Sequence, residues 1–243
     1  MKGIYYLLSC IALLPVLSAC DEGRLYEEDS PVTVEGRTVT LTARLAGVGT
    51  WPDTEYFLEL AGFDDESNYA VISKIVPAPS ADGGEVTVQL AGIKENVTHV
   101  ELCVLNRLRK HILSFYTIEE GTLKASSAIN VDAGTLDVGM FSTIQNSVFT
   151  TTCANCHGAA TSAAAGLYLI EGRSYDALVG VPSKKMEGKN IVEPGKADES
   201  VLYQTLSTAI SIIDGWKYNH TAEVVNDDIL HLIRTWINNG AKE

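Results

Sequence analysis

The first half of the chain alternates apolar and polar residues, the pattern of strands with one buried face. The alternation is clearest over residues 39–45, which read Val-Thr-Leu-Thr-Ala-Arg-Leu. Similar runs recur at 55–60, 69–76, 85–90, 97–105 and 112–118, separated by segments rich in glycine, proline, aspartate and asparagine. Six or seven short strands predict an all-β immunoglobulin-like sandwich over residues 31–124, with a small barrel as the competing shape.

The period of the pattern changes in the second half. Residues 125–136 are small and polar and predict a linker. Two helices are then expected from apolar residues that share one face. The first covers residues 137–151, with Val138, Phe141, Ile144, Val148 and Phe149 on that face. The last uses Ile229, Leu232, Ile233, Trp236 and Ile237, is capped by Asn226 or Asp227, and leaves His231 on the solvent side.

The chain begins with an export signal. Lys2 precedes a mostly apolar run that ends at Leu17 and is interrupted by Pro15, too short for the roughly 20 apolar residues of a bilayer span. This pattern predicts a secretory signal peptide over residues 1–19. Residues Leu17-Ser-Ala-Cys20 resemble the lipobox of bacterial lipoproteins. The resemblance implies that Cys20 becomes the mature N-terminus, carries fatty acyl chains such as palmitate, and anchors the protein to a membrane.

Residues 20–30 are acidic and form the expected lipidated tether. The segment is similar to acidic export signals that send lipoproteins to the outer face of the outer membrane, and a solvated spacer explains it equally well. The expected location is therefore the cell envelope, with the outer membrane or the cell surface favoured.

Composition excludes several classes of protein. The chain has 46% hydrophobic residues, too many for a disordered protein, and no repeated long apolar segments that would indicate several membrane spans. Its formal net charge is −13, which argues against nucleic acid as a partner because a phosphate backbone attracts basic surfaces.

One short motif in the second half carries the chemistry: Cys153-Ala-Asn-Cys156-His157. Two cysteines three apart can form thioethers to two vinyl groups of one porphyrin, and the adjacent histidine can bind its iron. A dithiol redox pair shares the cysteine spacing but is expected after a strand in a βαβ unit. A structural zinc ion needs four ligands, and the later histidines, His220 and His231, do not fit the usual spacing. A simple disulfide is a further alternative.

The residues around this motif carry a family resemblance. Besides the motif they include Gly166-Leu-Tyr-Leu169, Val192-Glu-Pro-Gly195 and the closing Trp-Ile-Asn-Asn-Gly-Ala241. Over residues 137–243 the sequence resembles class I cytochrome c domains. The resemblance implies a multidomain protein in which the β-sandwich is followed by a mainly α cytochrome c domain. It also implies one covalent haem c, attached through Cys153 and Cys156, with His157 as the proximal iron ligand.

The sixth iron ligand departs from the family pattern. Relatives usually supply a methionine shortly before the last helix, whereas this chain reads Trp-Lys-Tyr-Asn-His220-Thr there. His220 is therefore the preferred distal ligand, since a neutral imidazole binds haem iron well. Met186, the one methionine between the motif and the C-terminus, is the alternative, and an open or water-bound position is the third.

Other chemistry-bearing residues have simpler explanations. His99 and His111 stand alone in the pattern and are expected to be structural, and Cys103 is expected to pack inside a strand as a small apolar residue. The lysines at 184, 185 and 189 form either a docking patch for an acidic partner or a solvated loop.

Together these features predict an exported, lipid-anchored, monohaem protein that transfers single electrons to or from a redox partner protein. An alternative is a surface lipoprotein whose sandwich binds a glycan or a protein, with the haem structural or sensory. A haem peroxidase needs an open iron position and a nearby acid–base group, and no such group is evident. The oligomeric state is not indicated by any pattern.

Overall fold

The computed structural model describes residues 35–158, 161–208, 216–224 and 226–243. The signal peptide expected over residues 1–19, the acylated Cys20 and the acidic tether at 20–30 lie outside the described residues.

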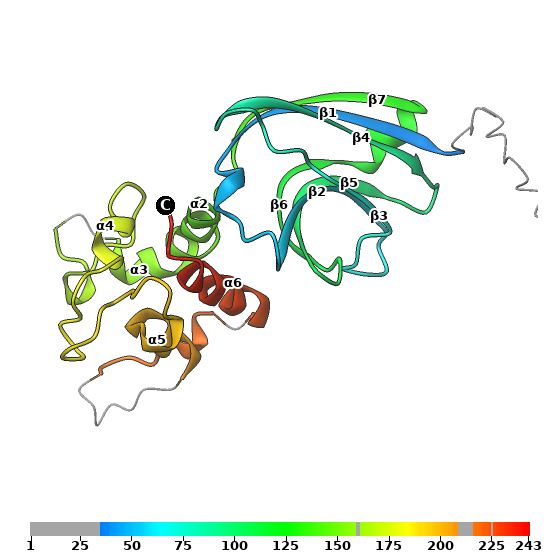
Figure 1. The fold of residues 1–243 in the computed structure, drawn as a ribbon. Coiled ribbons are helices and arrows are strands. Elements are labelled where there is room, and N and C mark those ends of the chain that lie inside the picture. The colour runs from blue at the N-terminus through cyan, green and yellow to red at the C-terminus, as the bar shows by residue number, and fades with distance from the viewer. Residues whose placement is uncertain (1–34, 159–160, 209–215, 225) are drawn as a thin grey trace, which may run out of the picture. The chain divides into compact units, whose positions relative to one another are not determined.

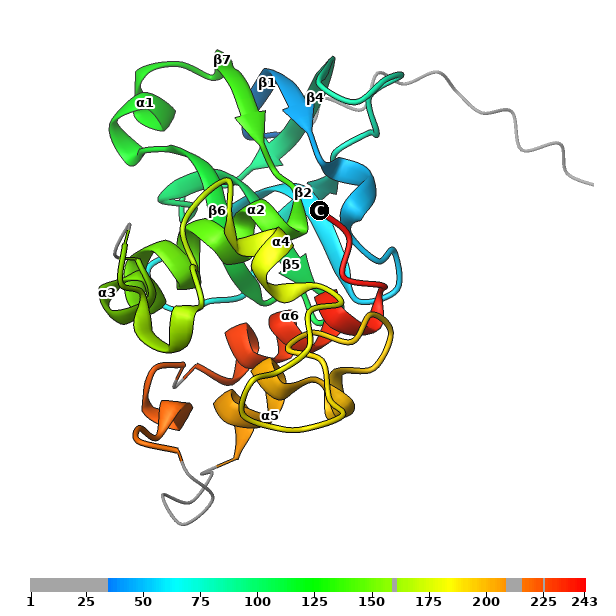
Figure 2. The same ribbon diagram turned by 90° about the vertical axis from the view of Figure 1, so that its left-hand side faces the viewer.

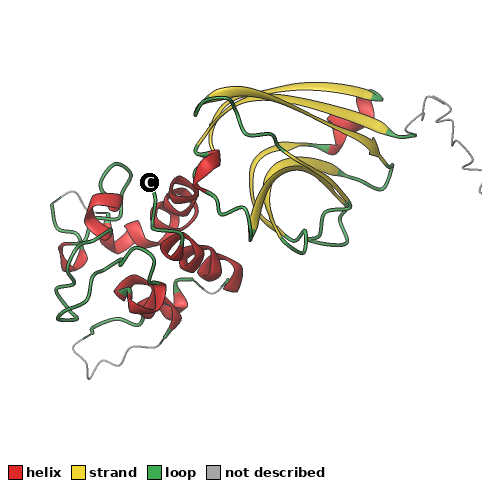
Figure 3. Cartoon of the chain, in the orientation of Figure 1, coloured by secondary structure: helices red, strands yellow, loops and turns green. Residues whose placement is uncertain are grey.

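Two β-sheets dominate the chain up to residue 137 (Figures 1 and 3). One contains three strands in the order β4-β1-β7, and the other contains four in the order β3-β2-β5-β6. Neighbouring strands are antiparallel, apart from β1 and β7, which run parallel. The strands are β1 (Arg37–Ala46), β2 (Tyr56–Phe63), β3 (Ile72–Ile75), β4 (Gly84–Ile93), β5 (His99–Asn106), β6 (His111–Ile118) and β7 (Ala128–Asp137).

The alternating pattern produces the buried face of each sheet. In β1, Val39, Leu41, Ala43 and Leu45 are buried, while the residues that alternate with them are more exposed. In the neighbouring strand β4, Val86, Val88 and Leu90 are likewise buried, and the residues between them are exposed. These side chains belong to one hydrophobic core with Leu58 and Leu60 of β2 and Val100, Leu102 and Val104 of β5. Burial of this apolar surface from both sheets is the main source of their stability.

Strand β7 corrects the expected linker. Residues 125–136 were expected to connect two domains, but residues 128–137 pair in parallel with β1 from Thr38↔Ala128 to Ala46↔Asp137. Ile129 is buried, and Val131, Ala133 and Leu136 pack against the same core. The segment is therefore the edge of a sheet, and no linker separates the strands from the helices that follow.

Short helices make up most of the regular structure after β7. The helices are α1 (Glu120–Ala125, before β7), α2 (Met140–Ile144), α3 (Ala154–His157), α4 (Ser174–Leu178), α5 (Val201–Ser207) and α6 (Asp227–Asn238). Single 3-10 turns occur at Val48–Thr50, Ala164–Gly166, Ala197–Glu199 and His220–Ala222. In the described part of the chain, no helix has the length and apolar character to cross a membrane.

The predicted fold class is wrong. A sandwich domain followed by a mainly α cytochrome c domain was expected, but residues 35–243 form one β-rich unit with a small helical C-terminal part. The longest α-helix among the described residues is α6, with twelve residues. The apolar periodicity marked helical segments correctly but said nothing about their number or length, and these differ from those of the expected domain.

One helical run leads into the cysteine motif. Between α2 and α3, residues Gln145–Cys153 have π-helical hydrogen bonding, and the backbone stays helical at both junctions. Its inward face contains four of the five apolar residues expected from the sequence; Val138 lies just before the run, and all five are buried. Phe141 packs against Trp236 of α6, with ring centroids 5.2 Å apart, and against Tyr175 of α4 at 5.1 Å. These contacts join the beginning of the run to the last helix.

Helix α6 agrees with the sequence pattern. Asn226 caps it, because its side-chain oxygen accepts a hydrogen bond from the backbone nitrogen of Asp228 at 2.9 Å. Leu232, Ile233, Trp236 and Ile237 are buried on one face. His231 lies on the other face with its side chain 56% exposed, where its Nε2 contacts Glu55 Oε2 at 3.1 Å.

Hydrogen bonds connect the turn after β1 to the start of the helical run. Trp51 Nε1 donates to the carbonyl of Val138 at 2.6 Å, and the backbone nitrogen of Met140 donates to Thr50 Oγ1 at 2.8 Å. Gly47 has φ of +80°, and a Cβ placed on it would lie 2.4 Å from Gly139 Cα. Only glycine at position 47 allows both this backbone conformation and this close approach.

We expect Gly47→Ala to lower the free energy of unfolding by about 2–4 kcal/mol, because the added methyl group combines left-handed backbone strain with a clash against the backbone of Gly139. Gly83→Ala is the matched control. Gly83 has φ of +74°, but no atom lies within 4 Å of its Cβ position, so only the strain of about 1 kcal/mol is expected. Urea unfolding followed by circular dichroism measures both values. Equal losses in the two variants would contradict the close approach at Gly47.

Candidate functional site

The Cys-x-x-Cys-His motif lies at the end of the helical run. Cys153 is the last residue of the π-helical segment, and Cys156 and His157 belong to α3. Cys153 is half-buried and packs against the core, Cys156 is exposed, and both are free thiols. π-helical segments widen a helix locally and are frequent at functional sites. The two sulfurs and the imidazole are thus carried on one short, continuous piece of backbone.

A backbone carbonyl orients His157. Its Nδ1 lies 3.2 Å from the carbonyl oxygen of Leu167, which can only accept a hydrogen bond. In the neutral tautomer that makes this hydrogen bond, Nδ1 carries the proton and Nε2 has the lone pair. A backbone hydrogen bond also links Leu169 N to the carbonyl of His157 at 2.9 Å, so the same chain segment holds both ends of the residue. Metal-binding histidines are usually held in this way, with the second ring nitrogen bonded to a carbonyl or carboxylate.

His220 lies next to His157. The centroids of the two imidazole rings are 6.3 Å apart, and the ring planes are inclined by 34°. His220 begins the 3-10 turn before α6, and Asn219 caps this turn by accepting a hydrogen bond from Thr221 N at 3.1 Å. Figure 2 shows the end of α3 and this turn on the same side of the helical part. The fold therefore brings the motif histidine together with the histidine that the sequence favoured as the second ligand.

Burial keeps the His220 ring neutral. Desolvation lowers its pKa below the usual value, the neighbouring His157 lowers it further, and Glu223 opposes both effects. A hydrogen bond to the backbone of Tyr218 also acts to raise the pKa, as expected when the ring donates to a carbonyl. With one nitrogen engaged by the backbone and the ring neutral, the other nitrogen retains a lone pair that can bind a metal.

Aromatic side chains that the sequence did not single out surround His220. Trp216 and Tyr218 both contact its ring edge-to-face, with centroids 6.2 and 5.1 Å away. The Tyr218 hydroxyl donates to the Glu223 carboxylate, whose charge also reaches Cys153. The contacts of Trp216, Tyr218 and Glu223 depend on how the chain folds around His220. The sequence gives one signal for them, the two aromatic residues within five positions of His220.

The alternative ligand Met186 lies in a different segment. It occupies the loop between α4 and the 3-10 turn at Ala197–Glu199, where its backbone nitrogen bonds to Ser183 Oγ at 3.1 Å. Of the nearby lysines, Lys189 donates from Nζ to Gln204 Oε1 at 3.1 Å. In the described structure this loop is organised by contacts with its own residues and with α5.

The geometry does not favour a compact metal ion at the motif. Ligand atoms around one zinc ion lie within about 4 Å of one another. Among the described residues, three or more histidine, cysteine or acidic ligand atoms lie within 4.8 Å of each other in only one group, and that group is on β5 and β6. A porphyrin has no such requirement, because its vinyl groups lie at the ring edge while the imidazoles bind at the centre.

The site is also unlike that of a dithiol oxidoreductase. Burial raises the pKa of the Cys153 thiol to about 11, and the charge of Glu223 adds to this effect. Reactive cysteines of dithiol enzymes instead have lowered pKa values, often at a helix N-terminus, whereas Cys153 lies near the end of a helical run. At neutral pH Cys153 is a thiol and not a nucleophilic thiolate.

Comparison of the chain with protein-family models, with curated proteins and with solved structures finds no match.

In the reduced, haem-free protein at pH 7, we expect iodoacetamide to alkylate Cys156 at least tenfold faster than Cys153, because Cys153 is partly buried and protonated. The rate at Cys153 should rise about tenfold per pH unit and level off near pH 11, because its folded-state pKa is raised. Peptide mass spectrometry measures both rates. Glu223→Gln should accelerate the alkylation of Cys153, because it removes the charge that helps to raise the pKa of this thiol. Glu95→Gln, in a turn of the sandwich, serves as the control. Equal rates at the two cysteines at pH 7 would contradict the burial of Cys153.

Proposed function

We propose that the protein carries one haem, bound covalently through Cys153 and Cys156, with His157 and His220 as its two axial ligands, and that it transfers single electrons. The observation that carries this proposal is the separation of the two imidazole rings. The proposal rests on this local arrangement of side chains and requires no cytochrome c fold.

The ring separation agrees with the geometry of one metal between two imidazoles. Metal–imidazole bonds are about 2 Å long, and a ring nitrogen lies about 1 Å from the ring centroid, so opposing ligands place their centroids about 6 Å apart. The centroids of His157 and His220 are 6.3 Å apart. Direct hydrogen bonding would bring two imidazoles closer, and packing alone would not require this spacing.

The donor set also suits a covalently attached haem. Each thiol can add across one vinyl group, with the sulfur bonding to carbon and the thiol proton completing the saturated carbon, so no oxidant is consumed. Cys156 is exposed and Cys153 is half-buried, so the haem would attach at the surface of the helical part. When bound, haem iron supplies reversible one-electron chemistry.

The surrounding residues would hold the ligands in place. The Leu167 carbonyl fixes the protonated nitrogen of His157, and the backbone of Tyr218 does the same for His220. The rings of Trp216 and Tyr218 contact the His220 ring edge-to-face and so restrain it. Two nitrogen ligands lack the thioether that raises the potential of Met/His cytochromes, so a lower potential is expected. With both axial positions taken, peroxidase chemistry at an open iron is disfavoured.

Export and anchoring complete the proposal. The signal peptide and the lipobox at Cys20 support an exported protein held in the cell envelope by acyl chains, with the outer membrane or cell surface favoured. The partner is then another redox protein in the same compartment. An electron carrier needs no substrate pocket, which agrees with a motif on the protein surface.

The first test is the spectrum of protein produced in a host that attaches haem. We expect a mass increase of one haem, a pyridine haemochrome typical of two thioethers, and a low-spin spectrum in both oxidation states. His220→Ala should convert the iron to high spin and allow the ferrous form to bind carbon monoxide. His220→Met should stay low-spin and raise the midpoint potential by on the order of 0.1 V, within the range of about 0.8 V set by axial ligands.

Two variants are matched controls for this test. His231→Ala removes the exposed histidine of α6, and Met186→Leu removes the alternative ligand; both should leave the spectrum low-spin. A high-spin spectrum in Met186→Leu, with no change in His220→Ala, would assign the sixth position to Met186. A colourless protein with an unmodified cysteine pair would refute the proposal as a whole.

The anchor is tested separately. We expect the mature protein to partition into the detergent phase of a Triton X-114 extraction, and Cys20→Ser to move it to the aqueous phase, because the acyl chains account for the membrane affinity. Cys10→Ser, within the expected signal peptide, is the control and should not change the partition. Detergent-phase recovery of Cys20→Ser would contradict acylation at this residue.

A further inference from the structure

A second group of metal-ligand side chains lies on the outer face of the four-stranded sheet. Residues of β5 alternate, so Leu102 and Val104 enter the main core while Glu101 and Cys103 face the other way. Cys103 is fully buried there in a separate small cluster that also contains Phe63 and Leu105. Packing explains the burial of this cysteine, as expected from the sequence, but not the polar side chains beside it.

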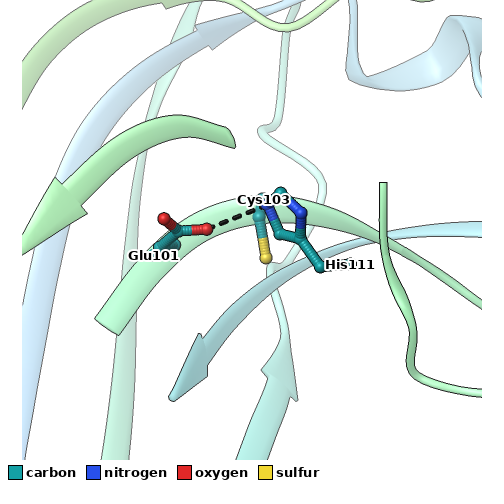
Figure 4. Close-up of side chains that lie close together, drawn as sticks. All are labelled: Glu101, Cys103 and His111. Atoms are coloured by element: carbon teal, nitrogen blue, oxygen red, sulfur yellow. Dashed lines mark ion pairs between the residues drawn. The ribbon is translucent and has the colours of Figure 1, made fainter. Parts of the chain in front are cut away.

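Glu101, Cys103 and His111 converge in this cluster (Figure 4). One ligand atom from each lies within 4.8 Å of the other two. His111 Nε2 is 2.9 Å from Glu101 Oε2, and Ser114 also donates to this carboxylate. Burial would raise the pKa of Glu101, but the hydrogen bonds from His111 and Ser114 keep it below the usual value. The carboxylate is therefore charged and already oriented at neutral pH.

An acidic residue of the neighbouring strand lies beside the group. Glu59 of β2 pairs directly with Cys103 in the sheet and thus shares its face. It is 8% exposed, and its charge acts on the Cys103 thiol together with that of Glu101. Negative charge gathered around a thiol favours a bound cation.

The site opens into an acidic pocket. A cavity of about 420 Å³ is lined by Glu101 and His111 together with Asp64, Asp65 and Glu66 of the loop that follows β2. Phe63 packs against His111 edge-to-face at 5.4 Å and so restrains the imidazole. The acidic loop raises the local concentration of cations, and the cavity gives them a route to Glu101 and His111, behind which Cys103 is buried.

We propose that Glu101, Cys103 and His111 bind a divalent ion of the zinc class, with the fourth coordination position open to the acidic pocket. A thiolate, an imidazole and a carboxylate are the three ligand types that zinc uses in proteins. Sulfur disfavours calcium and magnesium, which prefer oxygen ligands alone. The ion replaces the thiol proton of Cys103, which leaves as H⁺, so no redox step is involved.

The ligands need little movement to close around an ion. His111 is the first residue of β6 and Cys103 lies inside β5, so both ligands project from paired strands. Oxygen and nitrogen ligands of zinc lie about 3 Å apart, close to the existing separation of Glu101 and His111. The site is independent of the proposed haem site, since it shares no residue with it.

Zinc binding to the full-length protein in detergent tests the proposal. After dialysis against micromolar Zn²⁺, we expect one zinc per chain, with zinc K-edge absorption showing one sulfur at about 2.3 Å and nitrogen or oxygen at about 2.0 Å. Cys103→Ser should remove the sulfur shell and weaken binding at least tenfold. His111→Gln should weaken binding to a similar extent while keeping the sulfur, and it decides the result if Cys103→Ser does not fold.

Two controls separate this site from its surroundings. Cys153→Ala combined with Cys156→Ala should retain the zinc–sulfur distance, since the sulfur comes from β5. His99→Gln alters a histidine of the same pocket outside the ligand group and should change affinity less than twofold. A sulfur shell that survives Cys103→Ser, zinc bound by nitrogen and oxygen alone, or no zinc retained would each overturn the proposal.

Discussion

The packing of Phe141 against Trp236 is the contact on which the proposed haem site depends. Phe141 stands at the start of the helical run that ends in His157, and Trp236 lies in the helix that begins shortly after His220. Because a helical run transmits the position of one end to the other, fixing these two aromatic rings fixes where the two imidazoles meet. Tyr175 strengthens the junction by packing on Phe141 and donating its hydroxyl to the carbonyl of Ala241 at 2.9 Å.

Local patterns in the sequence predicted the elements that are amphipathic on their own. Six alternating segments form strands, and α6 has the expected face and N-cap. The interpretation failed at residues 128–137, which were assigned to a linker. Ile129, Val131 and Ala133 alternate with polar residues there, so the strand pattern is present in the sequence. The parallel pairing of this strand with β1 is a long-range contact that no local pattern indicates. The size of the helical part was overestimated because family resemblance, and not periodicity, supplied the expected architecture.

In the candidate sites too, the sequence revealed what lies in one contiguous stretch and missed what depends on long-range contacts. The cysteine motif is contiguous, so the sequence identified it directly, and the position of His220 before the last helix made it the preferred second ligand. The carbonyl of Leu167 could not be predicted, since any residue has one. Cys103 and His111 seemed unrelated in the sequence because their proximity depends on the β5–β6 register, which shifts between Leu102 and Cys103 and again after Val104.

A covalent haem places few demands on the fold that carries it, which reconciles the proposed function with the corrected architecture. A cofactor held only by packing needs a large apolar pocket, whereas two thioethers retain the haem even when much of it is exposed. What remains for the protein is to hold two imidazoles at the right spacing, and two carbonyl-anchored histidines on short segments can do this. An exposed Cys156 places one edge of such a haem at the surface, where an electron can pass to a partner without a binding cavity. Because the proposed haem would have an exposed edge and two protein ligands on its iron, the arrangement suits an electron carrier better than a haem enzyme.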